Sequence, residues 1–352
     1  MGGHHQCLIP LWLSVLTFFS MMGARFCQDK VVPQGSTTRV ECTIVPPGLS
    51  KLVNGVDITM LDLTPLDFTS ADGYKSPVIS FTCDDGRALV KGEQRYQQPD
   101  QIWQYVDNPG GWLTTDVHLS KTYSDVRSSL TKQVGGEGAI WKFAFSASKS
   151  YSKMQRSITN ATRYISEVSS YHSSSRVYML PSWLLQLNRV AKLYIRRYIE
   201  GKTYKSDPQA YQGFINLFGT HYFSVANFGG HIRMIQETKS SYFLSHTDQD
   251  VKINAKASLA KFLSANGGRA SSSTTANTQF AAASIETVSY YGGSTNLLST
   301  NGVQNWQPTV DEKPWLFSGA LKPLSNLIND DTQRSSMEQA VLQHVLRSYL
   351  VE

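Results

Sequence analysis

Hydrophobic and polar residues change their spacing at one point of the chain, close to Gly219. Before this glycine, one apolar helical face is predicted from residues at i, i+3, i+4 and i+7, namely Tyr211, Phe214, Ile215 and Phe218. Gly219 follows directly, at the kind of position where helices often end in a left-handed residue. The next residues, His221 to Phe228, are mostly apolar and β-prone, which predicts a buried strand.

Two adjacent glycines interrupt this predicted strand. Gly229 and Gly230 precede Ile232, Met234 and Ile235, whose apolar side chains continue the strand pattern. Glycine inside a strand weakens it and often marks a bend or a bulge. We therefore expect a sharp bend in the strand at this pair.

Two further stretches, about residues 119–158 and 239–286, alternate apolar and polar residues with period two. The apolar positions of this alternation are Trp141, Phe143 and Phe145 in the first stretch, and Val251, Ile253, Ala255, Ala257 and Leu259 in the second. The polar positions between them include Lys142, Lys252, Asn254 and Lys256. Such alternation predicts strands with one apolar face, yet both stretches are rich in Ala, Lys, Gln and Ser, which suit short helices. This conflict is expected of segments that adopt two states; the alternative is an amphipathic surface element that never moves.

Other segments give simpler patterns. Val78 to Cys83 predicts a strand that ends at the Asp84-Asp85-Gly86 turn. Pro181 to Glu200 predicts an amphipathic helix with proline in its first turn. About Asp331 to Tyr349 predicts a final helix with a wide apolar face.

The helix–stop–strand segment resembles the signature of the membrane attack complex/perforin (MACPF) family. The matching residues are Tyr211, Phe214, Phe218-Gly219-Thr220-His221-Tyr222 and Gly229-Gly230. The resemblance covers about residues 50–350. It implies an α+β fold, with a bent and twisted central antiparallel four-stranded sheet, two flanking clusters of short helices, and peripheral helices. The clusters would be the stretches 119–158 and 239–286, within a domain over 76–352 on which an N-terminal arm, 25–75, packs.

The resemblance also implies a function. A secreted protein of this family binds membrane lipid, assembles with further copies into a ring or arc, and unfurls both clusters into hairpins of a closed barrel. Trp141, Phe143, Phe145, Val251, Ile253, Ala255, Ala257 and Leu259 would then face lipid, and Lys142, Lys252, Asn254 and Lys256 would face the lumen, with Gly229 and Gly230 as the hinge. The alternatives are a non-lytic secreted protein that acts in binding or developmental signalling, and the pore-forming subunit of a two-chain, lectin-linked toxin.

Composition supports passage through the secretory route. The apolar run Leu8 to Phe19 predicts a signal peptide over residues 1–24, although no Lys or Arg precedes it; a retained anchor is the alternative. Of the four cysteines, Cys7 lies in this segment, so the arithmetic allows one bridge, from Cys83 to Cys42 or Cys27, and one spare thiol. That thiol could join a partner chain or stay buried. Asn160-Ala161-Thr162 is a glycosylation sequon.

Motifs for other chemistry are missing from the sequence. The histidines do not have the spacing of a metal site, and no nucleophile elbow or phosphate loop is present. We expect no enzymatic activity, no metal and no cofactor. The net charge of +6 is a mild basic excess. Its basic residues are either the solvated face of a helix or a surface attracted to an anionic membrane. No reader motif for nucleic acid is present.

Overall fold

The computed structural model describes residues 39–66, 72–107, 112–135, 139–265, 277–297 and 302–350. The predicted signal peptide and Cys27 lie outside these residues, and the side chain of Lys142 is also not described.

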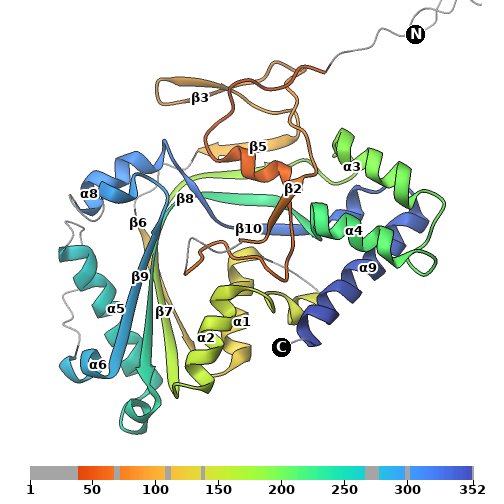
Figure 1. Cartoon of the computed structure of the whole chain (residues 1–352). Coiled ribbons are helices and arrows are strands. Elements are labelled where there is room, and N and C mark those ends of the chain that lie inside the picture. The colour runs from red at the N-terminus through yellow and green to blue at the C-terminus, as the bar shows by residue number, and fades with distance from the viewer. Residues whose placement is uncertain are drawn as a thin grey trace, which may run out of the picture. The chain divides into compact units, whose positions relative to one another are not determined.

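One large antiparallel sheet organises the chain (Figure 1). Its strands are β1 (Asn54–Val56), β2 (Tyr74–Pro77), β5 (Ile102–Asp107), β6 (Trp112–Ser120), β7 (Arg163–Met179), β8 (His221–Lys239), β9 (Ser284–Tyr291) and β10 (Trp315–Pro323). A separate hairpin pairs β3 (Ala88–Lys91) with β4 (Gln94–Gln97). The two longest strands, β7 and β8, pair along almost their whole lengths at the centre.

The central part of this sheet is four strands wide. The strands β5 and β6 pair with successive parts of β7, and β10 and β9 pair with successive parts of β8. The short strands β1 and β2 extend the sheet beside the beginning of β8. The predicted α+β class with a large antiparallel sheet is confirmed.

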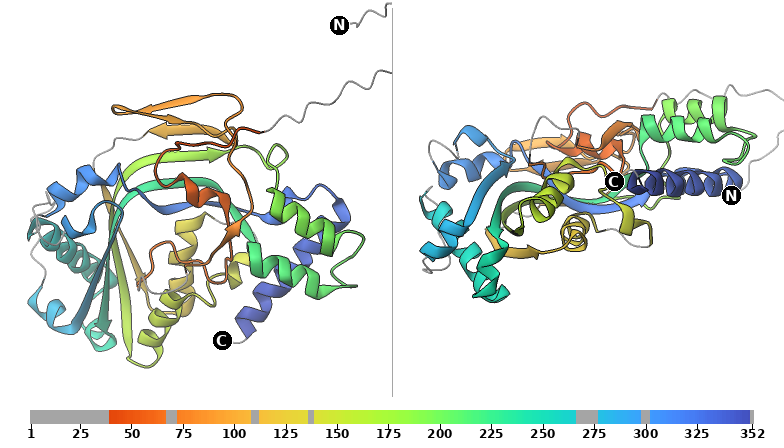
Figure 2. Two further views of the ribbon diagram at one scale, coloured as in Figure 1. Left: turned by 45° about the horizontal axis from the view of Figure 1, so that its top comes forward. Right: turned by 60° about the horizontal axis from the view of Figure 1, so that its bottom comes forward.

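Helices lie on both sides of the sheet and beyond one end of it. They are α1 (Tyr123–Val134), α2 (Lys149–Thr159), α3 (Arg189–Tyr194), α4 (Pro208–Phe218), α5 (Asp248–Ala265), α6 (Thr278–Ala283), α8 (Val303–Trp306) and α9 (Asp331–Leu350). The short 3-10 helices are η1 (Leu49–Val53), η2 (Ala139–Phe143), η4 (Ser240–Leu244), η5 (Gln307–Val310) and η6 (Leu324–Leu327), and η3 (Ile195–Ile199) is a π-helix continuing α3. Figures 1 and 2 show α5 and α6 on one side of the lower strands, and α1 and α2 on the other.

Alternate residues of the central strands serve two separate cores. Val168, Ile232 and Met234 point to one face and pack with α5 and Trp306. Ile165 and Ile235 point to the other face and belong to the larger core, which also takes in the buried sides of α1, α4 and α9. Because strand residues alternate between faces, each helical segment covers its own apolar surface.

One predicted element is wrong, and another begins later than predicted. Residues 78–83 form only isolated bridges, Ile79 with Leu187 and Thr82 with Glu41, so this apolar run is not a strand. The helix predicted from Pro181 begins at Arg189 instead. Asn188 caps it by accepting a hydrogen bond from the backbone of Ala191 at 2.8 Å, a capping interaction that proline cannot supply.

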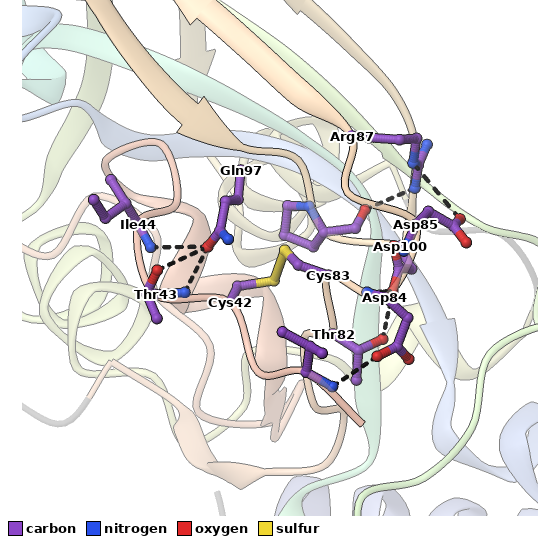
Figure 3. Close-up of a disulfide and its surroundings, with 12 residues drawn as sticks. Cys42, Thr43, Ile44, Thr82, Cys83, Asp84, Asp85, Arg87, Gln97 and Asp100 are labelled. Carbon is purple, nitrogen blue, oxygen red and sulfur yellow. Dashed lines mark hydrogen bonds and ion pairs between the residues drawn. A yellow bond between two sulfur atoms is a disulfide. The ribbon is translucent and has the colours of Figure 1, made fainter. Parts of the chain in front are cut away.

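A disulfide attaches the first described residues to the sheet domain. Cys42 and Cys83 are bridged, which is one of the two pairings left open by the sequence (Figure 3). The Gln97 side-chain oxygen accepts hydrogen bonds from the backbone of Thr43 at 2.6 Å and of Ile44 at 3.2 Å.

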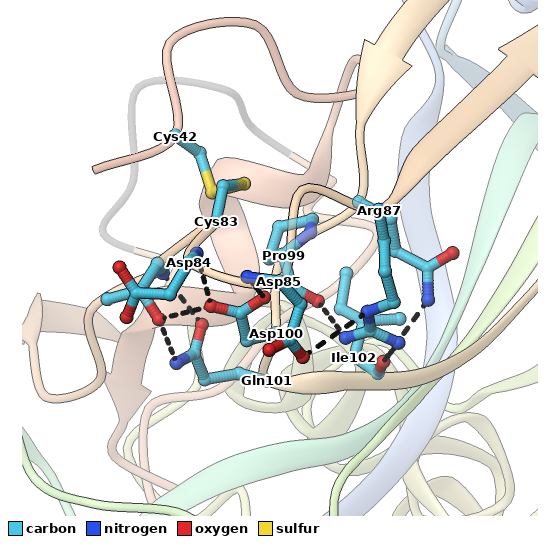
Figure 4. A network of polar contacts seen from close by, with 11 residues as sticks. Cys42, Cys83, Asp84, Asp85, Arg87, Pro99, Asp100, Gln101 and Ile102 are labelled. Atoms are coloured by element: carbon cyan, nitrogen blue, oxygen red, sulfur yellow. Dashed lines mark hydrogen bonds and ion pairs between the residues drawn. A yellow bond between two sulfur atoms is a disulfide. The ribbon is translucent and has the colours of Figure 1, made fainter. Parts of the chain in front are cut away.

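Carboxylates organise the loop that follows the bridge (Figure 4). Asp100 accepts hydrogen bonds from the Thr82 hydroxyl and the Asp84 backbone, both at 2.8 Å. Asp84 in turn accepts from the backbone of Val40 at 2.6 Å. The bridge and these bonds together fix the segment that begins at residue 39.

Candidate functional site

The junction between α4 and β8 joins two distant parts of the chain. Tyr211, Phe214, Ile215 and Phe218 are buried on one face of α4, as their spacing predicts. Gly219 ends the helix with a φ of 86°, and a Cβ atom there would lie 2.5 Å from the carbonyl oxygen of Val56. Only glycine fits this close approach.

Thr220 and His221 continue the junction into the sheet. The Thr220 hydroxyl donates to the Val56 carbonyl and accepts from the Ile58 backbone, each at 3.1 Å. Burial lowers the pKa of His221 to about 4, although the nearby Asp57 carboxylate opposes this effect. His221 is therefore neutral at pH 7. Its buried surroundings are those of a structural residue, and the adjacent Tyr222 is buried with it.

The sheet bends at Gly229 and Gly230. At this level β10 gives way to β9 as the neighbour of β8, because Trp315 pairs with Gly229 and Tyr291 pairs with His231. The register of β7 shifts opposite the same glycines, between Ser173 and Ser175. The pairing of the central strands therefore changes at one level of the sheet, and Figure 1 shows the strands turning sharply there.

Close contacts require glycine at both positions of the bend. A Cβ atom at Gly229 would lie 2.0 Å from the carbonyl oxygen of His172 on β7. At Gly230 it would lie 2.5 Å from the ring of Trp306, which is fully buried. The bend is thus tightly packed by the neighbouring strand and by α8.

Polar side chains also hold the bend, and the sequence did not single them out. The Lys91 ammonium donates to the Ser174 hydroxyl at 2.6 Å and lies 3.1 Å from an oxygen of Asp311. Ser174 donates to the same oxygen of Asp311 at 2.5 Å. Lys91 belongs to the β3–β4 hairpin and Asp311 follows η5, so the contact could not be inferred from local sequence.

The four central strands β6, β7, β8 and β9 end at about the same level at the other end of the sheet. Ser120 pairs with Ile165. Arg163 pairs with Lys239, and Thr238 pairs with Ser284. We call this line of paired residues the ladder end. Two helical segments of about 40 residues connect the strands beyond it, one carrying α1, η2 and α2 and the other η4, α5 and α6.

Aromatic residues of the first helical segment are packed against the body of the protein. Trp141 and Phe145 are buried, and the Trp141 ring lies 5.7 Å from that of His221. Phe143 is partly buried and its ring lies 5.0 Å from the Tyr349 ring on α9. The backbone of Phe145 has a φ of 65°, which is unusual for a residue with a side chain.

The second helical segment uses its apolar residues differently. Val251, Ala255, Ala257 and Leu259 are all buried beneath α5, whereas Ile253 is 43% exposed. Lys252 and Asn254 are partly exposed and Lys256 is exposed. Helix α5 therefore buries most of the predicted lipid-facing set and leaves one large member of it in water.

A buried ion pair fastens the first helical segment to the sheet. Arg233 on β8 and Glu167 on β7 lie 2.9 Å apart, and Glu167 accepts from Ser129 of α1 at 3.0 Å. Burial alone would raise the pKa of Glu167, but the charge and hydrogen bond of Arg233 hold that pKa below its usual value. Arg233 also donates to the Thr64 carbonyl at 2.6 Å. A single arginine within an apolar run was the available sequence signal.

The described residues contain neither a candidate metal cluster nor a long apolar helix. Within the described ranges, no group of three or more His, Cys, Asp or Glu residues is arranged to hold a metal ion. None of the helices there combines the length and apolar character that spanning a bilayer requires.

Comparison with known proteins gives a family and several relatives. A model of the MAC/Perforin domain family matches residues 45–352. The Perivitellin-2 67 kDa subunits of Pomacea canaliculata and Pomacea maculata are each 35% identical to this chain over 307 residues. The matched part is 87% of this chain but 54% of each relative, so the chain spans about half the length of these curated relatives.

The fold also matches a solved structure of low sequence identity. The crystal structure of GNIP1Aa from Chromobacterium piscinae superposes with a TM-score of 0.66 at 15% identity. The match covers 87% of this chain and 58% of that one. At this identity the likeness concerns the fold alone.

Proposed function

Because this chain belongs to the MAC/perforin domain family, we propose that it is a secreted pore-forming protein. The folded protein binds a membrane and assembles side by side with further copies. The two helical segments then leave the sheet and unfold into β-hairpins. These hairpins join across subunits into a closed barrel, the form in which strands can cross lipid with all backbone groups paired.

The ladder end is the observation that carries this proposal. Each helical segment connects two strands that stop at the same level, so extending all four strands needs no change of register. A segment of about 40 residues supplies two strands of roughly 20 residues, each reaching about 65 Å. Crossing a bilayer takes only about 9–11 residues per strand.

The outer strands support assembly with further copies. Among the described strands, β5 and β6 pair only with β7, and β9 pairs only with β8. Their outer edges therefore have no strand partner among the described strands. Such edges favour pairing with another chain, and a ring of copies would satisfy them.

Two engineered disulfides test whether the first helical segment must leave. The Ser146 and Ser348 hydroxyls are 2.8 Å apart and connect this segment to α9. The Thr238 and Ser284 hydroxyls are 2.9 Å apart and connect β8 to β9 at the ladder end, where no separation is required. The variant Ser146→Cys/Ser348→Cys should lock the segment, whereas Thr238→Cys/Ser284→Cys is its matched control.

The assay is dye release from liposomes of several lipid and glycolipid compositions. We expect the locked variant to lose leakage while oxidised and to regain it with reductant, and the control to leak in both states. Wild-type protein receives the same reductant, because the native Cys42–Cys83 bridge is also exposed to it. Equal leakage by the oxidised locked variant would refute the unfolding step, and no leakage from any form would refute pore formation.

One observation favours a second, compatible candidate: a subunit of a larger complex. The curated relatives are named as subunits, and they extend beyond the part that matches this chain. The spare cysteine predicted from the sequence could then join a partner chain, for example a lectin. Electrophoresis of the native material without and with reductant tests this, and a single band unchanged by reductant would exclude a disulfide-linked partner.

A further inference from the structure

The one N-glycosylation sequon of the sequence lies at a structurally defined place. Asn160-Ala161-Thr162 is the only Asn-Xaa-Ser/Thr sequence among the 352 residues. Asn160 is the C-terminal cap residue of α2, and Arg163 begins β7 two residues after Ala161. All three sequon residues are exposed.

The local backbone presents this turn outward. Thr162 has a φ of 48°, a left-handed conformation that reverses the chain between α2 and β7. The Ser240 backbone donates to the Thr162 carbonyl at 2.9 Å, which ties the turn to the start of the other helical segment. The sequon therefore occupies an exposed, ordered corner where both helical segments meet the ladder end.

We propose that Asn160 carries an N-linked oligosaccharide, and that this glycan marks the foot of the first inserted hairpin and stays on the near side of the membrane. The second part rests on the proposed pore-forming function. The first part requires only passage through the secretory route.

The position of Asn160 along the extended strand gives the physical reason. Arg163 is the first residue of β7 and pairs with Lys239 at the ladder end. Asn160 stands three residues before it, which is about 10 Å along a strand. A strand of roughly 20 residues reaches about 65 Å, of which about 30 Å lies within hydrocarbon. About 35 Å thus remains between the ladder end and the hydrocarbon, so Asn160 stays about 25 Å short of the hydrocarbon.

The same geometry predicts where a glycan is forbidden. A polar oligosaccharide cannot cross the hydrocarbon core, so a strand bearing one near its hairpin tip cannot insert. Lys256 is exposed on α5 and lies close to the middle of the second segment, which would become the tip. Lys256→Asn completes a sequon with Ala257 and Ser258.

A sequon at the foot of the neighbouring strand supplies the matched control. Thr122 is exposed just beyond Ser120, the last residue of β6. Thr122→Asn completes a sequon with Tyr123 and Ser124, and asparagine preserves the capping preference at the start of α1. If the pairing of Ser120 with Ile165 is continued, Thr122 stands opposite Arg163, about 10 Å nearer the sheet than Asn160, so its glycan would also stay on the near side of the membrane.

The first test is the modification itself. The full chain is expressed with its own N-terminus in a eukaryotic secretory host, and its mass is measured before and after treatment with peptide-N-glycosidase. We expect one glycan on the wild type and on Thr162→Ser, and none on Asn160→Gln or Thr162→Ala. Secreted wild-type protein without a glycan overturns the proposal.

The second test places the glycan relative to the membrane. In dye release, glycosylated wild type and Thr122→Asn should leak within about twofold of their enzymatically deglycosylated forms. Glycosylated Lys256→Asn should lose leakage at least tenfold and recover it on deglycosylation. Leakage by wild type only after glycan removal would overturn the near-side position, and so would full leakage by glycosylated Lys256→Asn. If deglycosylated wild type never leaks, pore formation is refuted and the position falls with it, whereas the mass measurement still decides the modification.

Discussion

Acid should destabilise the folded protein through two buried histidines. Burial lowers the pKa of His221 to about 4, with Asp57 opposing. Burial and the charge of Arg233 lower the pKa of His231 to about 4, with Glu167 opposing. Both start from 6.5, so the unfolded chain binds more protons than the folded one between pH 6.5 and 4. Stability must therefore fall as the pH falls through this window.

The magnitude follows from the two pKa values. At pH 5 an unfolded histidine is mostly protonated and a folded one with a pKa of about 4 is mostly neutral, which costs about 2 kcal/mol per residue. The two together remove about 4 kcal/mol between pH 7 and pH 5, a large part of the 5–15 kcal/mol typical of a domain. The raised pKa of the buried Asp62 acts in the opposite sense and reduces this loss.

Urea unfolding at pH 7, 6 and 5, with far-ultraviolet circular dichroism as the probe, measures this loss. His231→Phe is the informative variant, because the His231 ring stacks on Phe317 at 5.9 Å and its Nδ1 atom has no hydrogen-bond partner among the described residues. Phenylalanine keeps the stacking and removes the titration. We expect about half of the pH-dependent loss to disappear. A wild-type free energy of unfolding that is constant from pH 7 to 5, or a variant with the full loss, would refute the reasoning.

Three further predictions have separate expected outcomes. Ile253→Lys should leave the urea midpoint unchanged, because Ile253 is 43% exposed. It should strongly reduce liposome leakage, since lysine on the lipid face of a barrel strand costs about 2–4 kcal/mol. Ile253→Val is the control, and normal leakage by Ile253→Lys would contradict the prediction that residue 253 faces lipid. Gly229→Ala should cost at least about 3 kcal/mol in the same unfolding assay, because its Cβ would lie 2.0 Å from a carbonyl oxygen of β7. Gly92→Asn, at a left-handed position with no atom within 4 Å, should stay within about 0.5 kcal/mol, and equal losses would argue against the close packing. Replacing Cys42 and Cys83 by serine should cost about 4 kcal/mol from loop entropy across a separation of 41 residues, and an unchanged midpoint would show the bridge to be dispensable.

Local sequence patterns predicted the α4–β8 junction. The helical period, the glycine that ends the helix and the apolar run of the strand are all set by residues that are neighbours in the sequence. The same reasoning failed for residues 78–83 and for the start of α3. An apolar, β-prone run becomes a strand only if a partner strand is available, and residues 78–83 find only isolated bridges. The apolar residue Trp183 is 78% exposed, so it does not belong to a buried helical face.

The contacts that hold the site together could be predicted less well from the sequence. The Glu167–Arg233 pair depends on the register between β7 and β8, where Arg233 pairs with Ser169 and Glu167 with Ile235. That register is set by two whole strands rather than by neighbouring residues. The sequence also could not decide that Cys42 rather than Cys27 pairs with Cys83, because a count of cysteines gives no distances between them.

The sequence of α5 has a residue spacing that suits both a helix and a strand, and one position where the two differ. A spacing of four residues returns to the same face both in a helix, at 100° per residue, and in a strand, at 180° per residue. Val251, Ala255 and Leu259 follow this spacing and are buried in the folded protein, so they serve either state. A spacing of two separates the states: Ile253 shares a face with Val251 in a strand but points away from it in a helix. Its exposure in α5 means that the helical state gains little from isoleucine at this position. A lipid-facing strand would use that side chain fully, which is why Ile253, rather than its buried neighbours, separates a segment that inserts from one that only covers the sheet.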